Sequence, residues 1–249
     1  PKTLETHISH RLEKNIIMAA NSVVLILGSG PRIGASVAET FASNGYKVAV
    51  ASRKGTGAKT AEGFLSLKAD FTKPDSIPAL FDAVKTEFHT APSVVIYNAA
   101  ALSMPSDKDI VLSVPAETVA SDLNINTISP YVAAQQAISG WETLPKDTKK
   151  TFIYTGNILN VSIVPMPMML TLGMGKSASA FWIGLADMTL AARGFRFLYA
   201  DERKEDGTIK GHEIDGAAHG EFFAQLANHE GNVPWHATFV KGKGYVQFK

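Results

Sequence analysis

The chain has 249 residues, and its 24 Lys and Arg residues nearly balance its 23 Asp and Glu residues, leaving a formal net charge of +1. This length suits one large α/β domain, and a nearly neutral sequence without a basic block argues against nucleic acid or an anionic membrane as a partner. The chain has no cysteine, which excludes disulfides, thiolate catalysis and Cys-ligated zinc, and no apolar run near the roughly 18 residues of a membrane span, so we expect a cytoplasmic protein that acts on a small-molecule substrate.

The first 17 residues do not continue the pattern that follows them. Met18 and the small polar residues after it look like a natural start just before the first strand. We therefore interpret residues 1–17 as an N-terminal extension or a cloning-derived segment. Residues 18–249 are interpreted as a single domain.

The domain opens with Val23–Leu27, a continuous apolar run that is typical of a strand buried on both faces. A glycine-rich turn and a helix follow at once. Glycine has no Cβ, so the backbone can approach a phosphate closely, while a helix N-terminus presents free N–H groups and a positive dipole end to it. This combination predicts a dinucleotide-binding βαβ unit, with an ordinary tight turn as the alternative. The residues assigned to the cofactor here are Gly28, Ser29, Gly30, Arg32, Ile33 and Gly34.

The end of the second predicted strand, residues 47–51, indicates which nicotinamide cofactor is bound. An acidic side chain at this point usually holds the ribose of NAD(H), whereas the 2′-phosphate of NADP(H) requires Arg. Here Ser52, Arg53 and Lys54 follow the strand, and no acid is present. Arg32 in the first turn could close on the same phosphate. We therefore predict NADP(H), bound in part by Ser52 and Arg53.

Strand and helix patterns alternate through the rest of the chain. The remaining predicted strands are residues 64–69, 93–97, 151–155, 195–200 and 238–240. The predicted helices are residues 37–43, about 73–88, 115–140, 171–193 and 217–227, with a kink at Pro130 and a cap at Gly194. The alternation predicts a Rossmann-type doubly wound parallel sheet flanked by helices, with ligand at the carboxyl ends of the strands.

Several residues in this framework resemble the short-chain dehydrogenase/reductase family. Beyond the glycine-rich turn and Arg53, the matching residues are Asp70 after the third strand, Tyr97-Asn98-Ala99-Ala100 where the family usually has Asn-Asn-Ala-Gly, Asn126 in the kinked helix, and Lys176. The resemblance covers residues 22–249. It implies that Asp70 and Phe71 border the adenine and that Asn98, Ala99 and Ala100 line the cofactor's path. It also implies that Lys176 bonds the nicotinamide ribose, and that Asn126 supports a water linked to Lys176.

The sequence departs from the family at its catalytic positions. The family's Tyr-x-x-x-Lys motif would place tyrosine four residues before Lys176, where this chain has Leu172. The usual serine after the fifth strand corresponds to Asn157, which can still donate a hydrogen bond to a developing oxyanion. Loss of a positioned proton donor typically costs about 10²–10⁴-fold in rate. Candidate replacement acids are Tyr154, Tyr199, His212 and His219, and for each the alternative is a side chain that packs in the core or lies on a solvated loop.

Two further segments bear on the substrate. Residues 164–170, rich in methionine and proline, stand where the family borders substrate and predict an adaptable apolar wall, or else core or a subunit contact. Residues 201–207 replace the family's usual Pro-Gly with a charged sequence, which predicts a charged turn and a different lid.

Two functions fit this sequence. The first is an atypical oxidoreductase that transfers hydride between NADP(H) and a small apolar carbonyl or enone, with Lys176, Asn126 and Asn157 as catalytic residues. The second is a catalytically silent NADP(H)-binding sensor or partner subunit. The family resemblance also implies a homodimer or homotetramer assembled through the long helices. No metal site is expected, because His212 and His219 lack a carboxylate at metal spacing between them.

Overall fold

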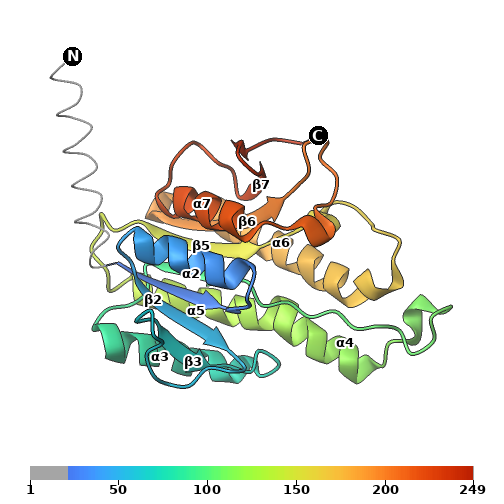
Figure 1. Cartoon of the computed structure of the whole chain (residues 1–249), viewed down its shortest axis with the longest axis horizontal. Helices are drawn as coiled ribbons and strands as arrows, with labels where there is room; N and C mark the ends of the chain where they lie inside the picture. Colours follow the sequence, from blue (N-terminus) through green and yellow to red (C-terminus); the bar gives the residue numbers. More distant parts are fainter. Residues whose placement is uncertain (1–21, 249) are drawn as a thin grey trace, which may run out of the picture.

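The computed structural model describes residues 22–248, so the predicted extension of residues 1–17 lies outside the described part of the chain. Within it, eight strands form one sheet in the order β3-β2-β1-β4-β5-β6-β7-β8 (Figure 1). All neighbouring strands are parallel except β7 and β8. The strands are β1 (Val23–Leu27), β2 (Lys47–Ser52), β3 (Leu65–Lys68), β4 (Val94–Tyr97), β5 (Lys150–Thr155), β6 (Phe195–Glu202), β7 (His236–Val240) and β8 (Gly244–Tyr245). The predicted doubly wound sheet is confirmed.

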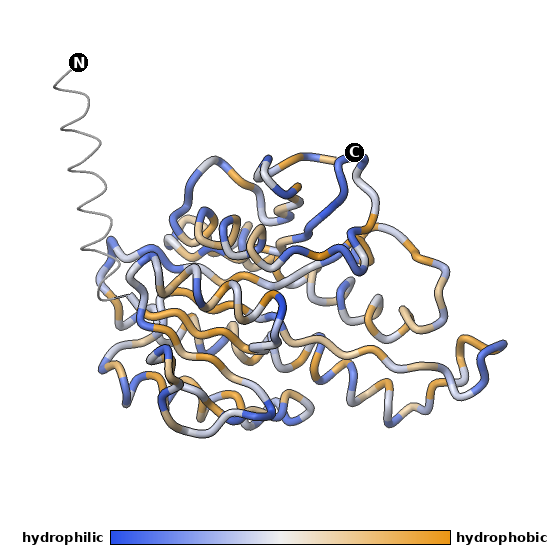
Figure 2. Tube along the Cα trace, viewed as in Figure 1, coloured by the Kyte–Doolittle hydropathy of each residue, from blue (hydrophilic) through white to orange (hydrophobic). Residues whose placement is uncertain are grey.

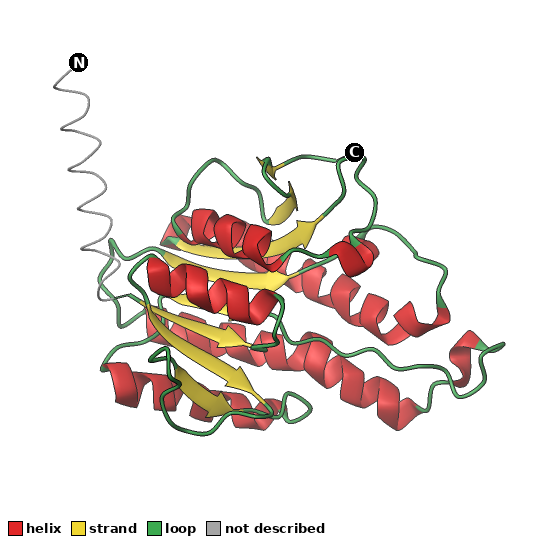
Figure 3. Ribbon diagram, viewed as in Figure 1, coloured by secondary structure: helices red, strands yellow, loops and turns green. Residues whose placement is uncertain are grey.

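Helices cover both faces of the sheet (Figure 3). The helices are α2 (Ile33–Ser43), α3 (Ile77–Phe88), α4 (Ala116–Leu123), α5 (Ser129–Trp141), α6 (Leu170–Leu190) and α7 (Gly216–Ala227). Helices α2 and α7 pack on one face through residues such as Phe41 and Phe223, and α3, α5 and α6 pack on the other through residues such as Trp141 and Ile183. Successive side chains of a strand point to opposite faces, and β1 contributes Val23, Leu25 and Leu27 to one core and Val24 and Ile26 to the other, so both of its faces are apolar. Figure 2 shows hydrophobic residues along the central strands.

The sheet reverses its winding direction between β1 and β4, the two strands that pair at its centre. In an open α/β sheet, ligands bind in the crevice that such a reversal leaves at the carboxyl ends of the strands. Here β1 leads into the glycine-rich turn, and β4 leads into Asn98. The loop after β4 then runs outward to α4, which extends beyond the sheet in Figure 1.

The long helix predicted over residues 115–140 is interrupted by a π-helical segment, Asn124–Ile128, directly before Pro130. Proline has no N–H to offer to the carbonyls four and five residues earlier, those of Asn126 and Ile125. Both carbonyls accept tyrosine hydroxyls from the sheet: Tyr97 donates to Ile125 at 2.6 Å and Tyr154 donates to Asn126 at 2.8 Å. The irregular backbone is therefore tied to the sheet.

The C-terminal half differs from prediction in one respect that affects the site. Strand β6 continues to Glu202 instead of ending at residue 200, and Asp201, Glu202 and Arg203 are all buried. The prediction of a charged turn beginning at Asp201 is wrong, because these charges are paired with partners inside the fold. The short strand β8 was not predicted.

We expect the tyrosine hydroxyls to contribute unequally to stability. Tyr97→Phe removes the hydroxyl on the Ile125 carbonyl and should lower the free energy of unfolding by about 1–3 kcal/mol. Tyr154→Phe should cost less, because Ser179 Oγ also donates to the Asn126 carbonyl, at 2.8 Å. Urea unfolding followed by circular dichroism compares the two variants, and a larger loss for Tyr154→Phe would contradict this account.

Candidate functional site

The glycine-rich turn is held against the end of β4 by backbone contacts. Gly28 has φ of 105°, a conformation that favours glycine, and a Cβ built on it would lie 2.3 Å from the Ala99 nitrogen. The Asn98 side chain donates from Nδ2 to the Gly28 carbonyl at 2.8 Å. Only a residue without a side chain fits at position 28, so β1 and β4 can approach closely here.

The N-terminus of α2 is open toward this turn. The first residue before the helix, Arg32, makes no side-chain cap, and no acidic side chain lies in the first turn. A Cβ on Gly30 would meet nothing within 4 Å, whereas a Cβ on Gly34 would lie 2.7 Å from the Ser29 Cα. Gly34 thus allows the helix to pack against the turn, and Gly30 leaves open space. This arrangement suits an anionic ligand at the helix N-terminus.

A crevice of about 830 Å³ adjoins the turn and contains most of the predicted cofactor residues. Its lining includes Gly28, Ser29, Gly30, Ser52, Arg53, Asp70, Phe71, Asn98, Ala99 and Ala100. Arg32, Ile33, Gly34 and Lys176 are not among the lining residues. The structure therefore brings together residues from the ends of four strands, as the sequence predicted, and leaves Arg32 exposed beside them.

The rim of the crevice beyond β2 is positively charged. Arg53 and Lys54 are exposed there and line the crevice. Asp70, an acid that lines the same crevice, accepts from the Thr72 hydroxyl at 2.7 Å and from the Thr72 N–H at 3.1 Å. These hydrogen bonds hold the pKa of Asp70 below its ordinary value, with Lys73 and Arg53 adding to the effect. The Asp70 carboxylate is thus already hydrogen-bonded to Thr72. Arg53 forms no ion pair among residues 22–248.

Lys176 lies at the carboxyl end of β5 rather than at the crevice wall. Its side chain is 4% exposed, its Nζ donates to the Thr155 carbonyl at 2.7 Å, and it stands 4.3 Å from the centre of the Tyr154 ring. Burial lowers the pKa of Lys176 to about 7, against the attraction of Asp201, which raises it. A charge change close to neutral pH is typical of groups that move protons.

Asn126 fixes the loop that follows β4. Its Oδ1 accepts from the Ala101 N–H at 2.9 Å, and its Nδ2 donates to the Ala101 carbonyl at 2.8 Å. A Cβ on Gly175 would lie 2.3 Å from the Asn126 Cβ, so α6 approaches the π-helical segment directly beside Lys176. The structure therefore places Asn126 next to Lys176, although its side chain is fully engaged with the backbone.

The side-chain amide of Asn157 is hydrogen-bonded at its oxygen but not at its nitrogen among residues 22–248. Its Oδ1 accepts from the Leu159 N–H at 3.0 Å, and its carbonyl accepts from the Tyr199 hydroxyl at 2.8 Å. Its Nδ2 donates to no acceptor in the described part of the chain. The Asn157 side-chain amide is thus held at its oxygen by Leu159, and its nitrogen is available to donate to a substrate oxygen, as the prediction requires.

A second cavity, of about 570 Å³, is apolar and borders the start of α6. Its walls come from residues 162–167, Met169 and Leu170, together with Val111, Leu159, Gly173, Met174 and Ser177. No charged side chain lines it, and Ile163 is 93% exposed beside it. The methionine- and proline-rich segment therefore forms an apolar wall, as predicted.

Comparison with known proteins places the chain in a family. The sequence profile described as enoyl-(acyl carrier protein) reductase matches residues 30–171, more than half of the chain. The short chain dehydrogenase/reductase dmxR12 from Cryptosporiopsis sp. (strain 8999) is 40% identical over 241 residues, which are 92% of this chain and 96% of the relative. The chain belongs to the short-chain dehydrogenase/reductase family.

Solved structures of short-chain dehydrogenase/reductase proteins share the fold at low sequence identity. A metagenomic short-chain oxidoreductase in complex with NADP has a TM-score of 0.72 and 14% identity, covering 90% of this chain and 97% of its own. The 3-ketoacyl-(acyl-carrier-protein) reductase from Brucella melitensis, complexed with NADH, has a TM-score of 0.73 and 18% identity, covering 88% and 96%. Among residues 22–248, no helix is both long enough and apolar enough to cross a membrane.

Three of the candidate replacement acids are not suited to donate a proton to a substrate. They are Tyr154, Tyr199 and His219. Burial raises the pKa of both tyrosines well above its ordinary value, and each hydroxyl donates to a backbone carbonyl. Burial lowers the pKa of His219 to about 4, and its Nδ1 lies 2.7 Å from the Asp215 carbonyl. These side chains are structural, whereas His212 lies on an exposed turn.

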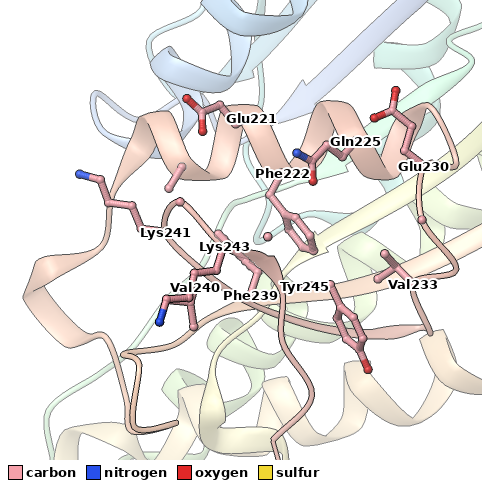
Figure 4. A pocket seen from close by; sticks show the side chains of 14 residues that line it. Glu221, Phe222, Gln225, Glu230, Val233, Phe239, Val240, Lys241, Lys243 and Tyr245 are labelled. Atoms are coloured by element: carbon pink, nitrogen blue, oxygen red, sulfur yellow. The ribbon is translucent and has the colours of Figure 1, made fainter.

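A third cavity, of about 390 Å³, lies between α7 and the segment around β7 and β8 (Figure 4). It contains none of the predicted site residues. Its lysines already have partners, since Lys241 pairs with Asp215 and Lys243 with Glu205. We assign it no part in the site.

Replacing the buried lysine tests its electrostatic cost. Below about pH 7 Lys176 is charged in the folded and unfolded states, so its burial penalty is fully present. As pH rises from about 7 toward the ordinary lysine value near 10.4, the unfolded state holds more protons and the penalty disappears. The stability of Lys176→Met relative to the wild type should therefore be greater at pH 6 than at pH 9.5, by about 1–4 kcal/mol.

Urea unfolding at these two pH values measures the difference. The matched control is Lys85→Met, which removes an exposed lysine from α3. A Lys176→Met variant with the same stability difference at both pH values would show that Lys176 titrates normally in the fold.

Proposed function

We propose that this protein is an oxidoreductase that transfers hydride between NADP(H) and a small, neutral, apolar carbonyl or enone. The observation that carries the proposal is the crevice at the reversal of the sheet, which is lined by the glycine-rich turn that leads into α2 and by Arg53, a residue with no ion pair among residues 22–248. Bound NADP(H) would supply the hydride. The two structural neighbours described above were solved with NADP and with NADH.

Each part of the crevice matches one part of NADP(H). Gly28, Ser29, Gly30, Ile33 and Gly34 would offer backbone to the pyrophosphate. Arg53, with Ser52 beside it and Arg32 across the turn, would hold the 2′-phosphate. Asp70 and Phe71 would border the adenine, and Asn98, Ala99 and Ala100 would line the path toward Lys176, which would bond the nicotinamide ribose.

The proton supply in this member is proposed to be atypical. Leu172, one helical turn before Lys176, is buried and cannot donate a proton. Asn157 would orient the substrate oxygen through its free amide, and the charge on Lys176 would remain the nearest source of positive potential. The uncharged lining of the cavity beside α6 favours a neutral, apolar substrate.

A catalytically silent NADP(H)-binding sensor or partner subunit is the second candidate. It is favoured by one observation: the tyrosines near Lys176 are tied to backbone carbonyls and are too deeply buried to reach a substrate. Such a protein would bind the reduced cofactor without oxidising it.

We also propose a homodimer or homotetramer. Helix α6 presents Phe181, Leu185 and Met188 at 76%, 54% and 78% exposure, and Tyr131 of α5 is also exposed. An exposed row of large apolar side chains is typical of a surface that packs against another protein.

The cofactor assignment predicts a selective loss in one variant. Arg53→Ala should weaken NADPH binding by about 10–100-fold, because a charge-assisted bond to the 2′-phosphate is lost. NADH binding, which involves no 2′-phosphate, should hardly change. Calorimetric titration of the wild type and variant with each cofactor measures this, with Lys85→Ala as a charge-matched control remote from the crevice.

Wild-type protein that binds neither cofactor up to millimolar concentration would overturn the proposed function. Equal binding of NADPH and NADH that Arg53→Ala does not change would overturn the role of Arg53 alone.

A further inference from the structure

Beyond the end of β5, strand β6 carries a buried acid. Asp201 is 0% exposed, and its Oδ2 accepts from Arg203 Nε at 2.6 Å. Arg203 is itself held in place, since its Nη1 donates to the Gly207 carbonyl and its N–H to the Phe239 carbonyl. The pair is therefore a fixed feature of the fold rather than a surface ion pair.

The second carboxylate oxygen of Asp201 has no hydrogen-bond partner. Oδ1 is buried, and no described residue donates to it. Buried polar atoms are nearly always satisfied in folded proteins, so an unsatisfied carboxylate oxygen calls for an explanation in function or in a bound water. It is the only carboxylate oxygen in residues 22–248 that is both buried and without a hydrogen bond or an ion pair.

Asp201 lies on the same face of the sheet as Lys176. Side chains two residues apart on a strand share a face, and Tyr199 faces the α6 side, where its ring stacks on that of Tyr154. The Lys176 ammonium lies over the Tyr154 ring. Thr155, whose carbonyl accepts from Lys176, pairs with Ala200 on the neighbouring strand. Asp201 is the next residue after Ala200, so it lies close to the same strand end.

The charges around the two groups act in opposite directions. Burial raises the pKa of Asp201 to about 6, while Arg203 and Lys176 lower it and Glu202 raises it. Burial lowers the pKa of Lys176, and Asp201 is the one charged group that opposes this. The ionisable groups on this side are Tyr154 from β5, Tyr199 and Arg203 from β6 and its end, and His236 from β7, whose ring contacts that of Tyr199. Glu202 points to the opposite face of the sheet, toward His219.

We propose that Asp201, held by Arg203, is a positioning residue that keeps the Lys176 ammonium charged at the carboxyl end of β5. The use of that charge rests on the proposed function. When hydride adds to a carbonyl carbon, negative charge develops on the oxygen. The Lys176 charge would stabilise that oxygen electrostatically, and the oxygen would then take up one proton from water.

The test follows the charge of Lys176 directly, without cofactor or substrate. The protein is labelled with ¹³C-lysine, and the Lys176 Cε resonance is identified by its loss in Lys176→Met. We expect a midpoint near pH 7 in the wild type and a midpoint lower by about one unit or more in Asp201→Asn. Glu205→Gln, which removes an exposed acid four residues away, should leave the midpoint unchanged.

A reciprocal measurement covers the case in which Asp201→Asn does not fold. Lys176→Met replaces the ammonium group by an apolar side chain of similar length. In this variant the titration midpoint of Asp201, followed by its ¹³C-carboxyl resonance, should rise above the wild-type value. The inference is overturned if neither group responds to the loss of the other. Cofactor binding is measured separately by calorimetry, so the two proposals can fail independently. NADPH binding without coupling between Asp201 and Lys176 would overturn this inference alone, and coupling without NADPH binding would overturn the proposed function alone.

Discussion

A buried cation at the carboxyl end of the sheet is the constraint around which the site is arranged. Moving an ammonium group out of water is costly, and the cost is tolerated only where nearby groups compensate for lost hydration. Lys176 has a carbonyl, an aromatic ring and the field of Asp201 for this purpose. The π-helical segment, which meets α6 at Gly175, closes the other side and ties the loop after β4 to the same point.

The crevice depends on a second constraint, the close approach of backbone at the reversal of the sheet. Gly28 leaves no room for a Cβ against Ala99, and Asn98 bonds back to its carbonyl. Because the strand ends are held together in this way, the glycine-rich turn that leads into α2 and the cationic end of β2 line one cavity. In the proposed function, the ends of β1 and β2 would hold the phosphates of the cofactor, and the ends of β5 and β6 would place the Lys176 charge near the substrate.

The sequence predicted the parts of this arrangement that depend on local pattern. Continuous apolar strands, glycine turns and the absence of an acid beside Arg53 are visible in the chain, so the doubly wound parallel sheet and most of the crevice lining could be predicted. Contacts between distant residues could not. The burial of Asp201 and Arg203 depends on pairing with β7 and on the Gly207 turn, and hydropathy alone assigns such charges to a loop. The π-helical segment could not be predicted either, because the carbonyls that it leaves without helical partners accept from tyrosines on distant strands.

Single-turnover hydride transfer tests the central claim most directly. Protein loaded with one equivalent of NADPH is mixed with neutral, apolar ketones, aldehydes and enones, and loss of the reduced cofactor's absorbance is followed by stopped flow. The account predicts stoichiometric oxidation with at least one such compound, and little with charged analogues of it, because the cavity beside α6 has no charged side chain. Tight NADPH binding with no oxidation by any of these compounds would contradict the enzyme assignment and leave the sensor role.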